Sequence, residues 1–559
     1  MNNYFKSILL VFCLVIFNDV TGQNVGGFKK QKPFEISGNF SIGASFNGTT
    51  RENIRRAPFS YIINGAPTIA IYGIQIPLSF TYSDQQLSFV KPFQRYGASP
   101  YYKWVKLHIG HRNLNFSPYS LTGQTFLGGG VELTPGKFEF TAFYGKFENI
   151  FATRSPFDVD VLPGETYDRK GYGLKIGYGG DKAKFDINFI KIVDESEAID
   201  PVLTDTLRIK PKENIVINPS IKFTFFKKLF IQSSVAASVI TQNRNANTGI
   251  IDDEIVQRFS PVLTVNQSTK VALAGDASAN LTLSKGSIGV KYQRIEPLYE
   301  SLGLYGIVND FENYTVNGDV SFFKKRLRIS VSQGYQRNNL TKLRQVTDLR
   351  KIGSYNANLS LKNGLNVNVQ YSNFQNDQEA GYVEVNDTIR LALVSKNLSL
   401  NSSYRWKKKK SEQSVSLFVG GQNFKDLNSE NRLSVNNKNN SGNLNYRINM
   451  KPLSFSLRGG LTYAAYEANN ELTNRIGASI GGSKKIFDDR VQIKLGFSFQ
   501  KSEVDNVNDG QVYKGHVGLS QKINDHNTLS LRASITNRNS IVKEAFIDYR
   551  ARFSYTVRF

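Results

Sequence analysis

The feature that most constrains this chain is an alternation of apolar and polar residues, clearest over residues 546–559. A β-strand sends successive side chains to opposite faces, so this stretch has one apolar and one polar face. From position 549 the odd positions are apolar, and the even positions are Arg550, Arg552, Ser554, Thr556 and Arg558. The alternation predicts an amphipathic strand, whose apolar face would cover a core in a soluble protein.

Similar segments recur from residue 34 to the end of the sequence, and their connections alternate between short and long. Short ones, such as 226–228 and 323–326, carry residues typical of tight hairpins. Long polar stretches, such as 242–268, 464–473 and 502–511, lie between them. A Greek-key sandwich has no reason to keep this parity over some twenty strands. We therefore predict an all-β fold, a transmembrane antiparallel barrel of about 24 strands (22–26) spanning residues 34–559, with short periplasmic turns and long extracellular loops.

The last strand resembles the C-terminal recognition strand of bacterial outer-membrane β-barrels. That family pattern has a final aromatic residue preceded by apolar residues in steps of two, although Ser554 replaces a common glycine and Val557 a common aromatic residue. The resemblance implies an outer-membrane location, contact with outer-membrane lipid, and insertion by the barrel-assembly machinery. The matching positions are Phe553, Tyr555, Val557 and Phe559.

Residues 1–22 have the features of a cleavable signal peptide. Lys6 precedes a short apolar run over residues 8–17, and small or modest residues lead to an expected cut between Gly22 and Gln23. The run is too short for a comfortable transmembrane helix. Cys13 is the only cysteine and lies within it, so the mature chain is expected to have neither disulfides nor cysteine-based chemistry. Residues 23–33 are then a short periplasmic N-terminal segment.

The composition agrees with strands that have one apolar and one polar face. The chain contains 39 Phe and 27 Tyr but is only 40% hydrophobic, and no apolar stretch after residue 22 reaches about 18 residues. The net charge of +24 favours nucleic acid, anionic lipid or acidic solutes as partners. Export makes nucleic acid an unsuitable partner. A barrel of this size is expected to enclose a wide interior with a polar inner wall.

The region around residues 84–125 fits the alternation least well. Pro92 and Pro100 fall near an aromatic-rich run over residues 93–104, and proline removes a donor from a strand ladder. Residues 84–101 are therefore either an inward-folded or docking segment, or an ordinary long loop at the membrane interface.

The sequence offers little support for catalysis, a cofactor or a metal. His108 and His111 fall on opposite faces of a strand, which does not suit one metal ion. No hydrolase or metalloprotease motif occurs, and no Ser/His/acid set can be placed on neighbouring strands. We therefore expect no catalytic, cofactor-binding or metal-binding residues and no enzymatic activity.

Basic residues on the polar strand faces are the more informative candidates. Rings of lysine and arginine favour anions in pores, although such residues also simply solvate a lumen or a rim. The lumen-facing basic candidates are Lys222, Lys291, Arg328, Lys494, Arg532, Arg552 and Arg558.

Two functions fit these features. The first is a wide channel for polar solutes, anionic ones among them. The second is an accessory or structural subunit of an outer-membrane machine for secretion, barrel assembly or nutrient uptake, with protein partners. The Phe/Tyr/Asn/Lys-rich style resembles barrels of the Bacteroidota. It also resembles energised receptors of the SusC type, but those carry an N-terminal plug domain. Only about ten residues separate the expected signal peptide from the first strand here.

Overall fold

The structure is a computed structural model. It describes residues 32–52, 57–84, 95–147, 150–151, 164–165, 167–199, 201, 204–205, 208–247, 253–382, 390–428, 436–468, 471–541 and 544–559. The expected signal peptide and most of the segment 23–33 lie outside these residues.

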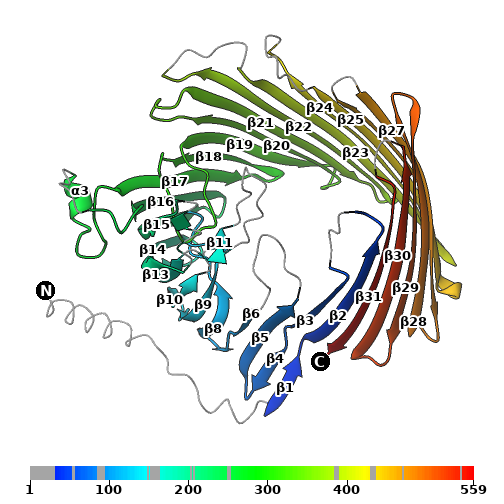
Figure 1. The fold of residues 1–559 in the computed structure, drawn as a ribbon, viewed down its shortest axis with the longest axis horizontal. Coiled ribbons are helices and arrows are strands. Elements are labelled where there is room, and N and C mark those ends of the chain that lie inside the picture. The colour runs from blue at the N-terminus through cyan, green and yellow to red at the C-terminus, as the bar shows by residue number, and fades with distance from the viewer. Residues whose placement is uncertain are drawn as a thin grey trace.

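Strands form most of the described chain (Figure 1). The N-terminal part contains β1 (Phe34–Ser37), β2 (Asn39–Thr49), β3 (Phe59–Gly65), β4 (Thr68–Ile71), β5 (Ile74–Ser83), β6 (Arg95–Ala98), β7 (Tyr101–Tyr102), β8 (Val105–Asn113), β9 (Thr125–Leu133), β10 (Phe138–Phe147), β11 (Ile150–Phe151) and β12 (Gly164–Glu165). The middle part contains β13 (Tyr167–Gly179), β14 (Ala183–Ala198), β15 (Glu213–Phe225), β16 (Leu229–Thr241), β17 (Thr269–Thr282), β18 (Gly286–Ile295), β19 (Phe311–Phe322), β20 (Leu327–Asn338), β21 (Val346–Ser360) and β22 (Leu365–Ala380). The C-terminal part contains β23 (Ala392–Lys408), β24 (Ser411–Asp426), β25 (Asn437–Met450), β26 (Phe455–Ala468), β27 (Glu471–Ile486), β28 (Val491–Val504), β29 (Val507–Lys522), β30 (Asn527–Ser540) and β31 (Phe546–Arg558).

Helical structure is marginal. It includes the short helix α3 (Glu254–Gln257), whose N-cap Asp253 accepts hydrogen bonds from the backbone of Ile255 and Val256, and the 3-10 turn η2 (Lys451–Leu453). Within the described residues, no helix combines the length and apolarity needed to cross a bilayer.

The antiparallel strands close into one ring. Each wall strand pairs with its sequence neighbour, and β2 pairs with β31 in an unbroken register from Asn39 opposite Arg558 to Thr49 opposite Asp548. Figure 1 shows these two strands, one from each end of the chain, side by side. Because β1 with β2, β3 with β4, and β6 with β7 each make a single wall strand in two pieces, the barrel has 26 strands. The predicted fold class and the interval of 22–26 strands are confirmed.

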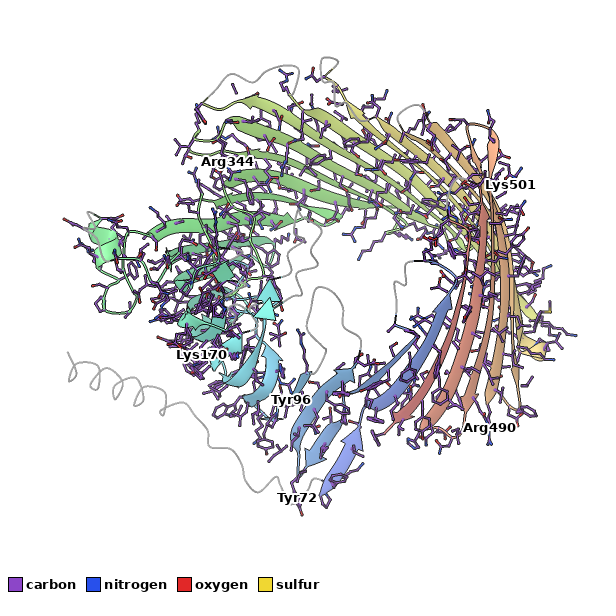
Figure 2. The ribbon with its side chains drawn as sticks, in the orientation of Figure 1. Tyr72, Tyr96, Lys170, Arg344, Arg490 and Lys501 are labelled. Atoms are coloured by element: carbon purple, nitrogen blue, oxygen red, sulfur yellow. The ribbon has the colours of Figure 1, made fainter. Side chains whose placement is uncertain are left out.

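At one end of the barrel the connections between strands are all short, as the alternation of short and long connections predicts. All twelve turns there, from 72–73 to 523–526, contain two to four residues. Figure 2 shows Tyr72, in the first of these turns, at the periphery of the ring. We call this side the short-turn rim and the opposite side the long-loop rim.

The prediction of long loops at 464–473 and 502–511 is wrong. β26 and β27 leave only residues 469–470 between them, and β28 and β29 leave only 505–506. Asp505 and Asn506 adopt left-handed backbone conformations, with φ of 49° and 65°. Such conformations form the tight type I′ turn of a two-residue hairpin, and Asn and Asp tolerate them better than most residues. The polar composition of these stretches therefore reflects long strands that continue above the apolar belt.

Of residues 84–101, expected to be an inward-folded or docking segment or else a long loop, the structure describes residue 84 and residues 95–101. Residues 95–98 and 101–102 form β6 and β7 within the wall, so this part does not fold inward. Pro100 lies between these two pieces, where it interrupts the ladder. Residues 85–94 lie outside the described part of the chain.

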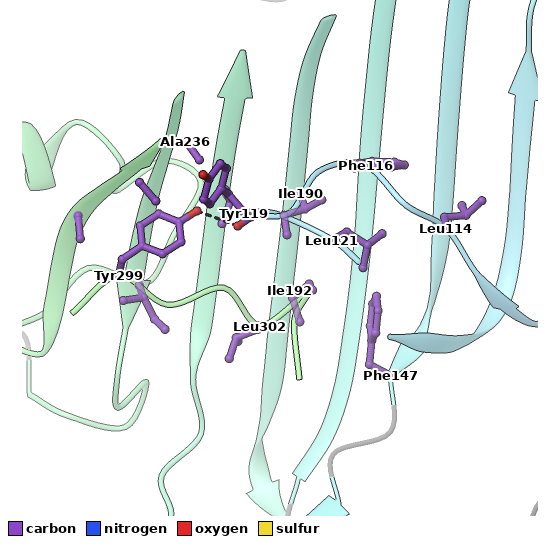
Figure 3. Packing of buried hydrophobic residues seen from close by; sticks show 14 of the residues in the cluster. Leu114, Phe116, Tyr119, Leu121, Phe147, Ile190, Ile192, Ala236, Tyr299 and Leu302 are labelled. Carbon is purple, nitrogen blue, oxygen red and sulfur yellow. Dashed lines mark hydrogen bonds between the residues drawn. The ribbon is translucent and has the colours of Figure 1, made fainter. Parts of the chain in front are cut away.

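The inner wall is not uniformly polar, contrary to the sequence interpretation. Its apolar side, formed mainly by β9, β10 and β14–β18, is covered by two loops, 114–124 and 296–310 (Figure 3). These strands contain apolar residues at successive positions, as in Ile215 and Val216, because their inward face packs under the loops while their outward face is apolar as well. The cluster comprises Leu114, Phe116, Tyr119, Leu121, Phe126, Phe143, Phe147, Ile190, Ile192, Val216, Ala236, Ile240, Ala272, Ala274, Ile295, Tyr299 and Leu302.

Candidate functional site in the lumen

The strand register shows which side chains face the lumen. Directly opposed residues of neighbouring strands lie on the same face of a sheet, so one known position fixes the next strand. Ile190 of β14 faces inward, because the loops cover it. Its register partners on the next three strands, Val216, Ser238 and Ala272, therefore face inward as well. The same rule carries the assignment through every later pair to β31 and β2. It places all seven basic candidates on the lumen-facing side.

Two of these candidates lie beside a carboxylate. Lys291 Nζ lies 3.5 Å from Asp276 Oδ2, and Arg328 Nη2 lies 3.4 Å from Asp319 Oδ2. Their charge is therefore largely compensated by the wall itself, and they act mainly in local ion pairs.

Two others lie near the short-turn rim. Lys222 lies opposite Lys184, and the Lys184 Nζ donates a 2.6 Å hydrogen bond to Glu139. Arg558 is the last residue of β31, and its backbone N–H donates to the carbonyl of His526 in the adjacent turn. Neither residue lies next to the other candidates.

The remaining three, Lys494, Arg532 and Arg552, lie in one row across the wall. Lys494 of β28 is opposite Gly518 of β29, Gly518 is opposite Arg532 of β30, and Arg532 is opposite Arg552 of β31. These three cations are exposed to the lumen. We call Lys494, Arg532 and Arg552 the basic row.

The basic row borders a lumen-facing hollow of about 580 Å³. A neighbouring cation, Arg550, also lines it, and its Nε donates a 3.2 Å hydrogen bond to Ser45 Oγ. Among the described residues that line this hollow, none is Asp or Glu. The polar residues that line it beside these four cations are Ser45, Ser60, Tyr61, Gln492, Ser520, Ser530 and Ser554.

Loops 114–124 and 296–310 are fixed to the opposite side of the lumen by buried hydrogen bonds. The Tyr299 hydroxyl donates a 2.7 Å bond to the Tyr119 carbonyl, and the Ser301 hydroxyl donates a 2.6 Å bond to the Ser120 carbonyl. The Tyr119 hydroxyl in turn donates a 2.7 Å bond to Asp276 of β17. We call these two loops the lumen plug.

Burial shapes the chemistry of both plug tyrosines. Tyr119 and Tyr299 are almost completely buried. Burial raises the pKa of the Tyr119 hydroxyl, and its hydrogen bond to Asp276 raises that pKa further. Burial likewise raises the pKa of the Tyr299 hydroxyl, with a smaller contribution from Tyr119. Both phenols are therefore neutral donors at physiological pH.

Charged side chains also hold the plug in place. Glu300 accepts hydrogen bonds from Lys212 Nζ at 2.7 Å and Gln242 Nε2 at 2.9 Å, and its backbone carbonyl accepts one from Ser238 at 2.6 Å. The amide of Asn214 joins the network, because its Oδ1 accepts from the backbone N–H of Leu302. Sequence reasoning missed these residues, since their partners are about 60 to 90 positions away.

The structure also assembles a Ser/His/acid set that could not be placed from the sequence. Ser99 Oγ lies 3.0 Å from His108 Nδ1, and His108 Nε2 lies 2.6 Å from Glu132 Oε1. The distances resemble those of a nucleophile, a base and an orienting acid. However, the Ser99 backbone N–H donates a hydrogen bond to the Pro77 carbonyl, and Lys106 Nζ donates one to Glu132. The set is thus a fully bonded link between β8 and its neighbours.

His111 lies on the other face of β8, as the sequence predicts, and packs edge-on against Tyr96 at 5.0 Å between ring centroids. Among the described residues, no three His, Cys, Asp or Glu side chains are grouped as metal ligands.

Comparisons with known proteins give only distant likenesses. No protein-family model matches the chain, and no curated protein matches it. The chain is similar to the P pilus usher PapC translocation pore, with 10% identity over 94% of this chain and 99% of that one and a TM-score of 0.34. It is also similar to the unliganded ferric citrate transporter FecA, with 10% identity, coverage of 94% and 79%, and a TM-score of 0.39. For OccAB2 of Acinetobacter baumannii the identity is 9%, the coverage 67% and 97%, and the TM-score 0.29. The assignment of a closed 26-strand barrel rests on the continuous pairing from β2 to β31.

Proposed function

We propose that this protein is an integral outer-membrane barrel that conducts polar solutes through its lumen and has no enzymatic role. The observation that carries the proposal is the contrast between the two faces of the wall. On the outward face, large apolar side chains are exposed, including Leu461 at 60% and Ile476 at 61%. On the inward face of β21–β25, asparagines stand opposite one another, as in Asn358, Asn368 and Asn401.

A membrane explains the outward face. Monomeric soluble proteins rarely expose a contiguous apolar patch larger than a few hundred Å². Here the apolar face continues around the ring, from β2 through β31. A bilayer removes that surface from water, and ring closure satisfies the backbone groups that lipid cannot.

The orientation follows from the loops. In outer-membrane barrels the short turns face the periplasm and the longer loops face outward. The start of β1 and the final residues of β31 then lie on the periplasmic side, since both lie at the short-turn rim. We further propose that residues 1–22 direct export and that the barrel-assembly machinery recognises the strand ending at Phe559. The proposal also includes an origin in the Bacteroidota.

The lumen supports conduction on one side only. The plug covers the inner faces of β9, β10 and β14–β18, whereas inward side chains such as Arg328, which is 62% exposed, remain open to water on the other side. We infer that a polar solute passes along β19–β31, where described inward side chains such as Arg328 are exposed. The proposal gives the Ser99, His108 and Glu132 set a structural role, since the Ser99 backbone N–H already donates to the Pro77 carbonyl and Glu132 also binds Lys106.

A second function, an accessory subunit of an outer-membrane machine, has its own supporting observation. Apolar side chains in other long loops are strongly exposed, namely Leu343 at 77% and Tyr382 at 62%. They lie on the long-loop rim, outside the apolar belt, where neither lipid nor the plug covers them. A protein partner on this rim would bury them.

Planar-bilayer recording of the purified full-length barrel tests the first function. We expect discrete conductance steps, and swelling of protein-containing liposomes in small sugars. Absence of both, from protein that shows β-rich circular dichroism, would overturn the channel. For the second function, native membranes are solubilised in mild detergent and the barrel is purified by affinity. Stoichiometric recovery of a second protein supports the subunit, and recovery of the barrel alone contradicts it.

A further inference from the structure

We propose that Arg532 and Arg552, with Lys494 and Arg550, form a lumen binding site for a small solute that carries a multiply charged oxyanion group of the phosphate or sulfate type. The inference rests on the proposed channel function for its biological meaning, because the solute reaches the site through the lumen. The binding site itself is a property of the folded wall.

The register brings two guanidinium groups together without an intervening residue. Arg532 and Arg552 are directly opposite on β30 and β31, and the Cβ atoms of such a pair lie about 4.5–5.5 Å apart. Like charges in this arrangement destabilise a sheet. Lys494 lies two strands further along the same row, about 10 Å away at the usual strand spacing. Gly518 fills the position between Lys494 and Arg532 and leaves the row open to a ligand.

Among the described residues, no carboxylate lies in the row of Lys494, Arg532 and Arg552. The residues that line the hollow include four cations and no carboxylate. Elsewhere on the same face the wall pairs some of its cations, as with Arg328 and Asp319 at 3.4 Å or Lys291 and Asp276 at 3.5 Å. Among the described residues, Lys494, Arg532 and Arg552 have no such carboxylate pair, and the same holds for Arg447 and Arg458, which are opposite each other on β25 and β26. A bound anion would remove the repulsion that the fold leaves in place.

A second row of hydroxyl groups lies beside the cations. Ser520, Ser530 and Ser554 are successive register partners on β29, β30 and β31, two positions along each strand from Gly518, Arg532 and Arg552. Ser520 Oγ and Ser530 Oγ lie 3.2 Å apart. Two positions on one strand are separated by about 6.8 Å. One oxyanion between the rows is within reach of arginine N–H donors and serine hydroxyls at once.

The geometry selects the class of ligand. The arginine fork matches the planar edge of phosphate and similar oxyanions, and it binds them more strongly than neutral acceptors. The hollow of about 580 Å³ falls within the range of small-molecule pockets, about 300–1,000 Å³. It therefore accommodates a phosphorylated or sulfated small solute in which the oxyanion faces the arginines.

Titration calorimetry on the full-length barrel in detergent tests the site, with inorganic pyrophosphate as the probe. We expect saturable binding that becomes at least about tenfold weaker in the R532Q/R552Q variant. The matched control is R328Q, which removes one lumen cation of a carboxylate pair and is expected to change the affinity less than about twofold. Repeating the titration with sulfate separates a phosphate-preferring site from a general oxyanion site, and both results support the proposal. Unchanged affinity in R532Q/R552Q, or an equal loss in R328Q, would overturn it.

Two further measurements keep the result interpretable. Circular dichroism and heat-modified gel mobility establish that each variant folds, and a second double variant, R532K/R552K, keeps the charge if glutamine prevents folding. Lysine lacks the bidentate fork, so we expect an intermediate affinity. Block of single-channel current by pyrophosphate is then recorded for the wild-type barrel. Binding without conductance contradicts the channel but supports the site, and conductance without binding does the reverse.

Discussion

The Tyr299 hydroxyl donates a 2.7 Å hydrogen bond to the backbone carbonyl of Tyr119, and this bond joins two loops that are 180 positions apart in the sequence. Both side chains are buried against the inner wall, so the bond lies inside the barrel but outside its strands. It defines the covered side of the lumen and therefore the width left for solutes.

The Tyr299→Phe variant tests this bond. The substitution keeps the ring in the cluster but leaves the Tyr119 carbonyl unsatisfied, at a cost of about 1–3 kcal/mol. We expect faster cleavage of residues 296–310 by an added protease and noisier open-channel current. The matched control is Tyr305→Phe in the same loop, where the side chain is 70% exposed and removal of its hydroxyl should have no effect. Equal behaviour of the two variants contradicts the role given to the plug.

High pH should release the plug. The pKa of both the Tyr119 and Tyr299 hydroxyls is raised by burial, so the folded state favours the protonated phenols. Their contribution to stability is complete below the ordinary tyrosine pKa of about 10 and is lost progressively as the pH rises above it. We expect the protease sensitivity of residues 296–310 to be constant from pH 7 to about 9.5 and to increase above about 10. A rise centred near neutral pH would show that other groups control the plug.

The joint between β6, β7 and β8 should be the weakest part of the wall. β6 and β7 each share only two register pairs with β8, whereas β23 and β24 share the whole run from Leu393 opposite Asp426 to Lys408 opposite Ser411. Side chains compensate in part, since Arg112 Nε donates to the Ala98 carbonyl at 3.2 Å. Hydrogen exchange followed by mass spectrometry should show faster exchange over residues 95–113 than over 393–426. Slower or equal exchange at residues 95–113 contradicts the paired register.

The two faces of one strand should respond differently to the same charge. Ile535 and Ser534 are neighbours on β30, and the register places Ile535 on the outward face and Ser534 on the lumen face. An arginine on the lipid face near the bilayer midplane costs about 2–4 kcal/mol. We expect Ile535→Arg to lower the free energy of unfolding in lipid vesicles by an amount of this order, and Ser534→Arg to change it by less than about 1 kcal/mol. Equal tolerance of both would mean that Ile535 does not face lipid.

The alternation of residue types predicted most of the wall, because a strand with lipid on one side and water on the other must alternate. This is clear for β31, where Tyr549, Phe553 and Tyr555 lie on one face and Arg550 and Arg552 on the other. The strand number is 26, within the predicted interval and slightly above its centre of about 24. The difference arises from pieces such as β6 and β7, where prolines break the alternation.

Tertiary contacts limited the prediction elsewhere. Ile190 and Ile192 lie on the lumen face, which the pattern treats as polar, and they are buried only because loops from distant positions cover them. The periodicity of one strand cannot reveal that cover, although the successive apolar residues around positions 189–193 are a usable signal. Similarly, the alternation placed both Lys291 and Arg532 on the polar, lumen-facing side and could not distinguish their roles. In the structure Lys291 forms an ion pair with Asp276 from a neighbouring strand, and the pattern of one strand cannot reveal that partner.

The closed ring is the central claim, and the pairing of Ala44 with Phe553 tests it most directly. The two positions are opposed on β2 and β31, at a Cβ separation close to that of a disulfide. In a mature chain without Cys13, the Ala44→Cys/Phe553→Cys variant should form a disulfide on mild oxidation, and the denatured chain should then migrate as a large circle on a gel. The control pair Ala44→Cys/Leu531→Cys, one strand further round, should remain reduced. No shift in the first pair, or an equal shift in both, would contradict a barrel closed between β2 and β31.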